Sequence, residues 1–319
     1  MRTLAALLLS VGAADALAAT PPFPNKPIRW ISPFAAGGGS DLTTRAVAQK
    51  LSERVAQPVV VDNRVGASGS IGAAIAAKAP RDGHTLVTLT VSMVTYDASA
   101  SSTPYDVVRD FTPLTQMTSQ PYVLIVNPSV QASSVGELLA LARAKPGSLR
   151  YGSSGIATLQ HLAGALFAHT TKTDLVHVPY KGGAPALTDL VSGELQFFFG
   201  VAASSMALIK AGKVRALAVT SRKRSTFMPQ LPTMIEGGVR DYVVDNWYGV
   251  LAPAGLPRDV AARLERELTA ALAQPDLRER LARDGSDTTP HGSAAFGSLI
   301  RSELEQWRRV IRETGIKVE

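Results

Sequence analysis

The chain of 319 residues contains no cysteine and only five histidines. The absence of cysteine excludes a catalytic thiol and a lipid anchor on an N-terminal cysteine, and it removes the usual zinc-binding patterns. The histidines are isolated, and none belongs to an HExxH motif or a comparable cluster. The sequence therefore indicates neither a metal site nor a cofactor site.

Nucleotide and nucleic-acid motifs are also missing. The glycine run at Gly37–Gly39 has neither the GxGxxG spacing of dinucleotide folds nor the Lys-Ser/Thr pair of a P-loop. The chain has 33 basic and 26 acidic residues, a net charge of +7 that weakly favours anionic partners. Because the basic residues are dispersed and the run Arg222–Arg224 is short, we expect no nucleic-acid partner.

The N-terminus has the order of regions found in a secretory signal peptide. Arg2 precedes an apolar stretch from Leu4 to Ala14, and small residues surround Ala18 and Ala19. The apolar stretch is too short to span a bilayer as a mature helix. We therefore predict that residues 1–19 are a cleaved signal peptide and that the mature protein is periplasmic.

Short apolar strands alternate with helical patterns along the rest of the chain, which is typical of an α/β fold with parallel strands. The first set has strands at Ile28–Ser32, Val59–Val61 and Leu86–Thr90 and helices at Leu42–Val55 and Gly72–Ala79. The second set begins at Tyr122 and includes a helix opened by the capping box Ser134–Glu137. The chain thus predicts two similar α/β units.

The length of the mature chain favours two compact lobes rather than one core. Since no low-complexity linker separates the units, we expect strands to cross between the lobes, with a ligand cleft beyond the carboxyl ends of the strands. The first lobe is assigned to residues 20–121 and 233–319, and the second to 122–232. Two late amphipathic helices, at Val260–Leu272 and Phe296–Ile311, are expected to cover one sheet.

The stretch Pro33–Asp41, PFAAGGGSD, joins the first predicted strand to the first helix. Glycine lets the backbone approach a ligand closely, and the first turn of a helix leaves N–H donors unpaired. Such a turn suits a carboxylate or a phosphate. The alternative is a structural turn in which Ser40 or Asp41 only caps the helix.

A second loop, Tyr151–Thr158 or YGSSGIAT, repeats this arrangement before a helix that contains His161. Two helix N-termini that face one cleft can each hold one carboxylate of a diacid. The hydroxyl groups of Ser153, Ser154 and Thr158 would add donors. The pair of loops predicts a binding site for a small organic acid.

The same loop also admits a hydrolase, with Ser153 or Ser154 as the nucleophile and His161 as the base. The nucleophile elbow of such enzymes needs GxSxG, whereas this chain has GSSG. His161 lies in a helical pattern beside Leu162, which favours a packing or capping role. We therefore prefer a binding protein without catalytic residues.

Two later segments carry polar or aromatic residues next to predicted strands. Tyr180 and Lys181 follow a strand and can reach an anionic ligand, or else Tyr180 packs and Lys181 stays solvated. Asn246, Trp247 and Tyr248 can line the cleft or pack in the core, and we favour packing.

Ten short segments form an ordered set of motifs over the mature chain. In order they are FPNKPIR from Phe23, PFAAGGGSD from Pro33, QPVVVDNR from Gln57, GASGSIG from Gly66, APRDGHTL from Ala79, DF from Asp110, YGSSG from Tyr151, HVPYKGG from His177, GKVRALAV from Gly212 and LPT from Leu231. With this set the chain resembles the Bug family, the periplasmic receptors of tripartite tricarboxylate transporters.

The resemblance implies a type II periplasmic binding protein fold that closes over a small organic acid and delivers it to a membrane permease, without a reaction. It also implies that backbone groups and waters at the two loops hold the ligand carboxylates. The candidate ligand-binding residues are Phe34, Ala35, Ala36, Gly37, Gly38, Gly39, Ser40, Asp41, Ser92, Ser153, Ser154, Gly155, Ile156, Thr158, His161, Tyr180 and Gly200.

One departure from the family pattern bears on the ligand. We expect an acidic residue where this chain has Gly200, directly after Phe197–Phe199. Its loss argues against amino acids and leaves room for a bulkier or aromatic acid. Ser92 and Met93 are expected at the floor of the pocket, where methionine would tolerate varied apolar shapes.

The leading hypothesis is a monomeric periplasmic receptor for a di- or tricarboxylate, aromatic acids included, with permease subunits as its partners. A periplasmic sensor that reports the ligand to a signalling partner is the second hypothesis. A secreted Ser-His hydrolase is the third.

Overall fold

The structure is a computed structural model that describes residues 23–34, 36–99, 103–180, 183–225, 228–283 and 285–315. The predicted signal peptide at residues 1–19 and Ala35 of the first loop lie outside the described residues. In the part of the chain that is described, no helix combines the length and the apolar composition needed to cross a bilayer.

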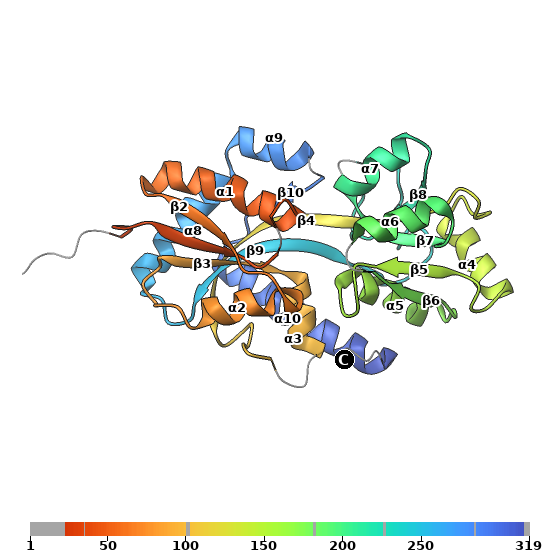
Figure 1. The fold of residues 1–319 in the computed structure, drawn as a ribbon, viewed down its shortest axis with the longest axis horizontal. Coiled ribbons are helices and arrows are strands. Elements are labelled where there is room, and N and C mark those ends of the chain that lie inside the picture. The colour runs from red at the N-terminus through yellow and green to blue at the C-terminus, as the bar shows by residue number, and fades with distance from the viewer. Residues whose placement is uncertain are drawn as a thin grey trace, which may run out of the picture.

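The strands form two lobes that share one long strand, β4 (Figure 1). The strand order is β2-β1-β3-β9-β4-β7-β5-β6, and β8 and β10 also pair with β4. The bounds are β1 (Ile28–Ser32), β2 (Val59–Asn63), β3 (Thr85–Thr90), β4 (Phe111–Val126), β5 (Arg150–Ser153), β6 (Val176–Pro179), β7 (Phe197–Val201), β8 (Arg215–Val219), β9 (Asp245–Pro253) and β10 (Asp287–Thr288).

Strand β4 passes from one lobe to the other between Pro121 and Tyr122. Its first part, Phe111–Pro121, pairs with β9, and its last part, Tyr122–Val126, pairs with β7 and β8. The parallel arrangement predicted from the sequence holds between β1, β2 and β3 and between β5, β6 and β7. The alternating pattern does not predict that β4 and β9 run antiparallel to their neighbours.

Helices cover both faces of the first lobe. They are α1 (Gly39–Val55), α2 (Ser70–Ala77), α3 (Val91–Ser99), α8 (Arg258–Leu272), α9 (Pro275–Arg283) and α10 (Ser293–Thr314), with a short 3₁₀ turn at Ala67–Gly69. Trp30 packs in one core cluster with Leu264 of α8, whereas its neighbour Ile31 packs in the other with Phe296 of α10. Because successive strand residues face opposite sides, α8 and α10 cover opposite faces of the same sheet.

The second lobe carries α4 (Val135–Ala144), α5 (Leu159–Thr171), α6 (Gly183–Ser192) and α7 (Ala202–Lys210). The predicted cap of α4 is present, since the Ser134 hydroxyl accepts a hydrogen bond from the Glu137 amide at 3.2 Å. Residues 233–244, which the sequence assigned to the first lobe, contact this lobe. Within them Tyr242 stacks on Phe199 and donates to the carbonyl of Ala163 at 2.8 Å.

The connections between the lobes meet at Thr220. The Thr220 hydroxyl accepts from the Tyr122 amide at 2.9 Å, and the Thr220 amide donates to the Tyr122 carbonyl at 2.9 Å. The Thr220 carbonyl accepts from the Val244 amide at 3.0 Å. A rotation of one lobe relative to the other therefore bends the chain near this point.

Two partly buried acidic residues lie next to this crossing. Asp245 begins β9 opposite Pro121, and Glu303 of α10 accepts a hydrogen bond from Trp307 Nε1 at 2.7 Å. Burial raises the pKa of Glu303 to about 7, and the charge of Asp245 adds to this effect. Burial also raises the pKa of Asp245 to about 6, against the opposing charge of Arg222.

The variant Glu303→Gln tests this assignment. Folded wild-type protein keeps a proton on Glu303 that the unfolded chain releases, so the free energy of unfolding should fall as the pH rises from about 4.5 to about 7. The full effect is about 3 kcal/mol, and Glu303→Gln should remove this part of the slope in urea unfolding. Exposed Glu305 on the same helix supplies the control Glu305→Gln. Equal slopes in wild type and Glu303→Gln would contradict a protonated Glu303.

Candidate functional site

A cavity of about 540 Å³ lies between the lobes, beyond the carboxyl ends of the parallel strands. Both lobes and both long strands contribute to its wall. Its lining residues are Phe34, Gly38, Gly39, Ser40, Ser68, Thr90, Ser92, Tyr122, Ser154, Thr158, Leu159, Gln160, Gly183, Val201, Asn246 and Tyr248.

Five helices of the described chain begin at this cavity. Gly39 and Ser40 open α1, Ser92 lies in the first turn of α3, and Gly183 is the first residue of α6. Leu159 and Gln160 open α5, and Val201 directly precedes α7. Each of these helices follows a strand, namely β1, β3, β6, β5 and β7 respectively. The positive ends of five helix dipoles therefore converge on one space.

The helices from the two glycine-rich loops lack a capping side chain. Gly38 is the N-cap of α1 and Thr158 that of α5, and neither makes a side-chain capping hydrogen bond. Their first-turn amides therefore stay available to a ligand. Within the described residues the cavity is lined by no charged side chain. Its electrostatic preference for an anion thus comes from backbone dipoles and hydroxyl groups.

Asp41 braces the first loop from behind instead of lining the cavity. Its carboxylate accepts hydrogen bonds from the Gly37 amide at 2.9 Å, from Arg45 Nε at 2.9 Å and from Asn63 Nδ2 at 2.7 Å. Burial opposes ionisation, but these donors outweigh it and hold the pKa of Asp41 below its ordinary value. Gly37 has a φ of +80°, a conformation that favours glycine at this turn.

Ser153 has a similar bracing role in the second loop. Its hydroxyl is fully buried, and it bonds the Gly155 carbonyl at 2.9 Å, the Gly155 amide at 3.1 Å and His177 Nε2 at 2.7 Å. Gly155 has a φ of +137°, which a residue with a side chain rarely adopts. The loop is therefore held by a side chain beneath it.

A stacked pair of imidazoles supports the same loop. The rings of His161 and His177 lie 3.8 Å apart with an interplanar angle of 11°. His161 Nδ1 accepts from the Ala157 amide at 3.1 Å, so this nitrogen carries no proton. Burial lowers the pKa of both rings to about 4, and for His177 the proximity of His161 adds to the shift.

These contacts do not form the hydrogen bond from Ser153 or Ser154 to His161 that the hydrolase hypothesis named. The Ser154 hydroxyl bonds the side-chain oxygen of Gln160, and the buried Ser153 hydroxyl bonds His177 and not His161. Groups of three or more histidine, aspartate or glutamate side chains suited to a metal ion do not occur among the described residues.

The structure brings part of the predicted site together. Seven predicted residues line the cavity: Phe34, Gly38, Gly39, Ser40, Ser92, Ser154 and Thr158. Nine described ones do not line it: Ala36, Gly37, Asp41, Ser153, Gly155, Ile156, His161, Tyr180 and Gly200. Ala35 lies outside the described residues. That the site residues contact a ligand stays a prediction.

Tyr180 and Gly200 illustrate why some predicted positions lie elsewhere. The Tyr180 hydroxyl donates to Asp189 at 2.7 Å within its own lobe. A Cβ atom at Gly200 would lie 2.1 Å from the Ser205 hydroxyl, so a side chain there points into the core, and Val201 borders the cavity instead. Met93 is also fully buried in the core and does not line the cavity.

Sequence reasoning favoured packing over a cavity position for Asn246, Trp247 and Tyr248, and it missed other lining residues. Asn246 and Tyr248 border the cavity, whereas Trp247 between them packs against Phe296. The period of two along a strand is the signal that separates them, once β9 is known to pass beside the cavity. Gln160 and Tyr122 were also missed, and the sequence carries no motif that marks them.

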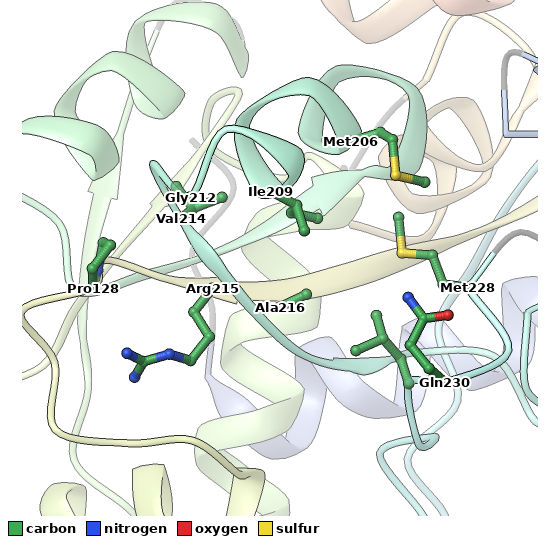
Figure 2. Close-up of a pocket in the computed structure, with 10 residues that line it drawn as sticks. Pro128, Met206, Ile209, Gly212, Val214, Arg215, Ala216, Met228 and Gln230 are labelled. Carbon is green, nitrogen blue, oxygen red and sulfur yellow. The ribbon is translucent and has the colours of Figure 1, made fainter.

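A second cavity, of about 420 Å³, lies in the second lobe alone (Figure 2). Met206 and Ile209 of α7 border one side and Met228 the other, and Arg215 points away from the two methionines. Its guanidinium group is engaged, because it donates to the carbonyl of Ala132 at 2.8 Å. This cavity lacks converging helix N-termini, and the interlobe cavity is therefore the candidate ligand site.

The two lobes, the crossing strand and the interlobe cavity define a solute-binding protein of the periplasmic type. The chain belongs to the tripartite tricarboxylate transporter family receptors, TctC, whose family model matches residues 43–316. Proteins named Bug are among its relatives, which agrees with the resemblance seen in the motifs.

Two curated relatives are similar over most of their length. The UPF0065 protein in the tcbD-tcbE intergenic region of Pseudomonas sp. strain P51 is 40% identical over 91% of this chain and 87% of its own. Protein BugT of Bordetella pertussis is 35% identical over 93% of this chain and 92% of its own.

Two solved structures of relatives contain ligands. The structure of R. palustris Rpa4515 with adipate has 33% identity and a TM-score of 0.83, covering 92% of this chain and 99% of that one. The structure of MatC (Rpa3494) from Rhodopseudomonas palustris with bound malate has 27% identity and a TM-score of 0.79, covering 91% of this chain and all of that one.

The bracing role of Asp41 predicts a stability defect in Asp41→Asn. The amide cannot accept all the hydrogen bonds of the buried carboxylate, so the new NH₂ group faces donors inside a buried site and the free energy of unfolding should fall by about 1–3 kcal/mol. Asp259 also lies in the first helical turn, of α8, but is exposed. Its variant Asp259→Asn should change stability by about 0.5 kcal/mol or less in urea unfolding. Equal effects of the two variants would contradict the bracing role.

The stacked imidazoles predict an unusual titration. In NMR spectra the ring protons of His161 and His177 should titrate with midpoints near pH 4, well below the ordinary value of 6.5. The unfolded chain takes up these protons first, so the pair contributes stability above pH 6.5 that is lost as the pH falls toward 4. Midpoints near 6.5 would show that the rings are not held neutral by burial.

Proposed function

We propose that this protein is a periplasmic receptor that captures a small organic dicarboxylate in the interlobe cavity by cleft closure and delivers it to a tripartite tricarboxylate-type permease. Residues 1–19 would direct export, and the receptor would act as a monomer. We place one lobe at residues 20–121 and 245–319 and the other at 122–244, because Tyr242 packs on the second lobe.

The convergence of five helix N-termini on one uncharged cavity carries this proposal. Helix N-termini favour anions through their dipoles and unpaired amides. The openings of α1 and α5 come from different lobes, so each can hold one end of the same molecule. Binding then favours the arrangement of the lobes in which both ends are held.

Aromatic residues in the lining support a ligand with an apolar part. Phe34, Tyr122 and Tyr248 are among the lining residues and give the cavity aromatic surface. Adipate and malate, the ligands in the structures of two relatives, are both dicarboxylates. We therefore favour a linear or aromatic diacid over citrate or an acidic amino acid, whose additional charge would meet no charged partner in the lining.

A sensor would use the same cavity, and it differs only in its partner. Purified permease subunits in nanodiscs should bind the ligand-loaded receptor if it serves transport. Association with a membrane kinase under the same conditions would favour the sensor.

A thermal-shift panel tests the ligand class. Wild-type protein from Thr20 to Glu319 should melt several degrees higher with a matching diacid, because a ligand at a hundred times its Kd adds about 2.7 kcal/mol to the free energy of unfolding. The panel contains adipate, malate, terephthalate, benzoate, citrate and glutamate. The bound acid should be recovered unchanged, and ester substrates should not turn over. No shift with any acid would contradict the proposal, and turnover that is lost in Ser154→Ala would favour the hydrolase.

A further inference from the structure

Gln160 differs from the other lining residues in that its side-chain oxygen, Oε1, is hydrogen-bonded while its side-chain nitrogen, Nε2, is not. It is the second residue of α5, is only 5% exposed and borders the cavity. Its Oε1 atom accepts from the Ser154 amide at 3.0 Å and from the Ser154 hydroxyl. A backbone N–H can only donate, so the atom facing Ser154 must be the oxygen. Nε2 is therefore turned away from Ser154.

Nε2 of Gln160 has no hydrogen-bond partner among the described residues. It is also absent from the buried polar side-chain atoms that lack a partner, so Nε2 keeps contact with solvent. Gln160 lines the cavity and belongs to the first turn of α5, whose N-cap makes no side-chain hydrogen bond, so the cavity is the solvent that Nε2 can reach. A nearly buried amide thus presents two donors and no acceptor to the cavity.

Ser154 also lies near the opening of a second helix, because a Cβ atom added to Gly183, the first residue of α6, would meet the Ser154 hydroxyl at 3.5 Å. The Ser154 amide opposes a reversal of the Gln160 side-chain amide, since a reversed amide would place an N–H donor against the backbone N–H.

We propose that Gln160 is a specificity-determining residue, whose Nε2 donates hydrogen bonds to a carboxylate oxygen of the bound acid, and that Ser154 is the positioning residue that holds the amide in this orientation. The inference rests on the proposed function and deepens it. It assigns the recognition of the acid's second-lobe end to a neutral side chain together with the α5 amides. A carboxylate has only hydrogen-bond acceptors, so each of its oxygens can accept a hydrogen bond from these donors.

Isothermal titration of four proteins tests the assignment. The probe is adipate, or the diacid of the panel with the largest thermal shift if adipate gives none. Gln160→Met keeps the length of the side chain and removes the donors, so the Kd should rise about ten- to a hundredfold, as for one hydrogen bond to a charged group. Gln49→Met on an exposed position of α1 is the matched control and should leave the Kd within twofold. Ser154→Ala should weaken binding two- to fivefold.

The variant Gln160→Glu separates specificity from general damage. Glutamate can still accept both bonds from Ser154, but it presents an acceptor to the cavity. Binding of the diacid should weaken more than a hundredfold. The monoamide of the same diacid should lose less affinity, because its amide NH₂ group can donate to the new carboxylate. The ratio of the diacid's affinity to the monoamide's affinity should therefore fall at least tenfold. A merely structural role would weaken both ligands equally and leave the ratio unchanged.

Three outcomes are distinguishable. If no acid binds the wild type, the proposed function fails. If the diacid binds and Gln160→Met stays within twofold, the role of Gln160 is overturned while the receptor function stands. If Gln160→Met does not fold, the side-chain amide resonance of Gln160 is followed by NMR in wild-type protein. A shift of this resonance on adding the diacid supports the role of Gln160, and an unchanged resonance overturns it.

Discussion

The first-turn amides of a helix cannot be satisfied within the helix, and this fold directs five sets of them to one space. The strand-to-helix order brings this about, because β1, β3, β5, β6 and β7 each end at the edge where the following helix begins. Helices and core clusters elsewhere keep the two edges facing each other. Where β4 crosses between the lobes, the hydrogen bonds of Thr220 connect Tyr122 to Val244, next to the partly buried acids Asp245 and Glu303.

In the two loops that precede α1 and α5, backbone amides donate hydrogen bonds to nearby side chains of the protein. The Gly37 amide donates to Asp41, that of Ser154 to Gln160, and that of Ala157 to His161. Glycine permits the backbone turns, but side chains under the loops give them one shape. In the receptor proposed above, recognition is therefore divided: bracing residues shape the loops, while helix amides, hydroxyl groups and Nε2 of Gln160 would face the ligand.

The parts of the site that depend on backbone geometry could be predicted from the sequence. The runs around Gly38 and Ser154 have the strand, glycine-rich loop and helix order that any such turn requires, and both line the cavity. Side-chain direction was harder to predict. Asp41 points behind the loop, and Gly200 faces Ser205. Tyr122 needs the register of β4 across two lobes, a long-range property that local pattern does not contain.

The absence of charged side chains among the described lining residues affects selectivity. A buried arginine would bind any carboxylate strongly and would need a charged partner when the cavity is empty, because an unpaired buried charge is costly. Helix dipoles and neutral donors avoid that cost, since the amides are solvated by water in the empty cavity. The attraction to anions is then shared by every helix opening and is similar for many acids. In the proposed receptor, discrimination would therefore come from the few neutral groups with fixed direction and from the aromatic surface of Phe34, Tyr122 and Tyr248.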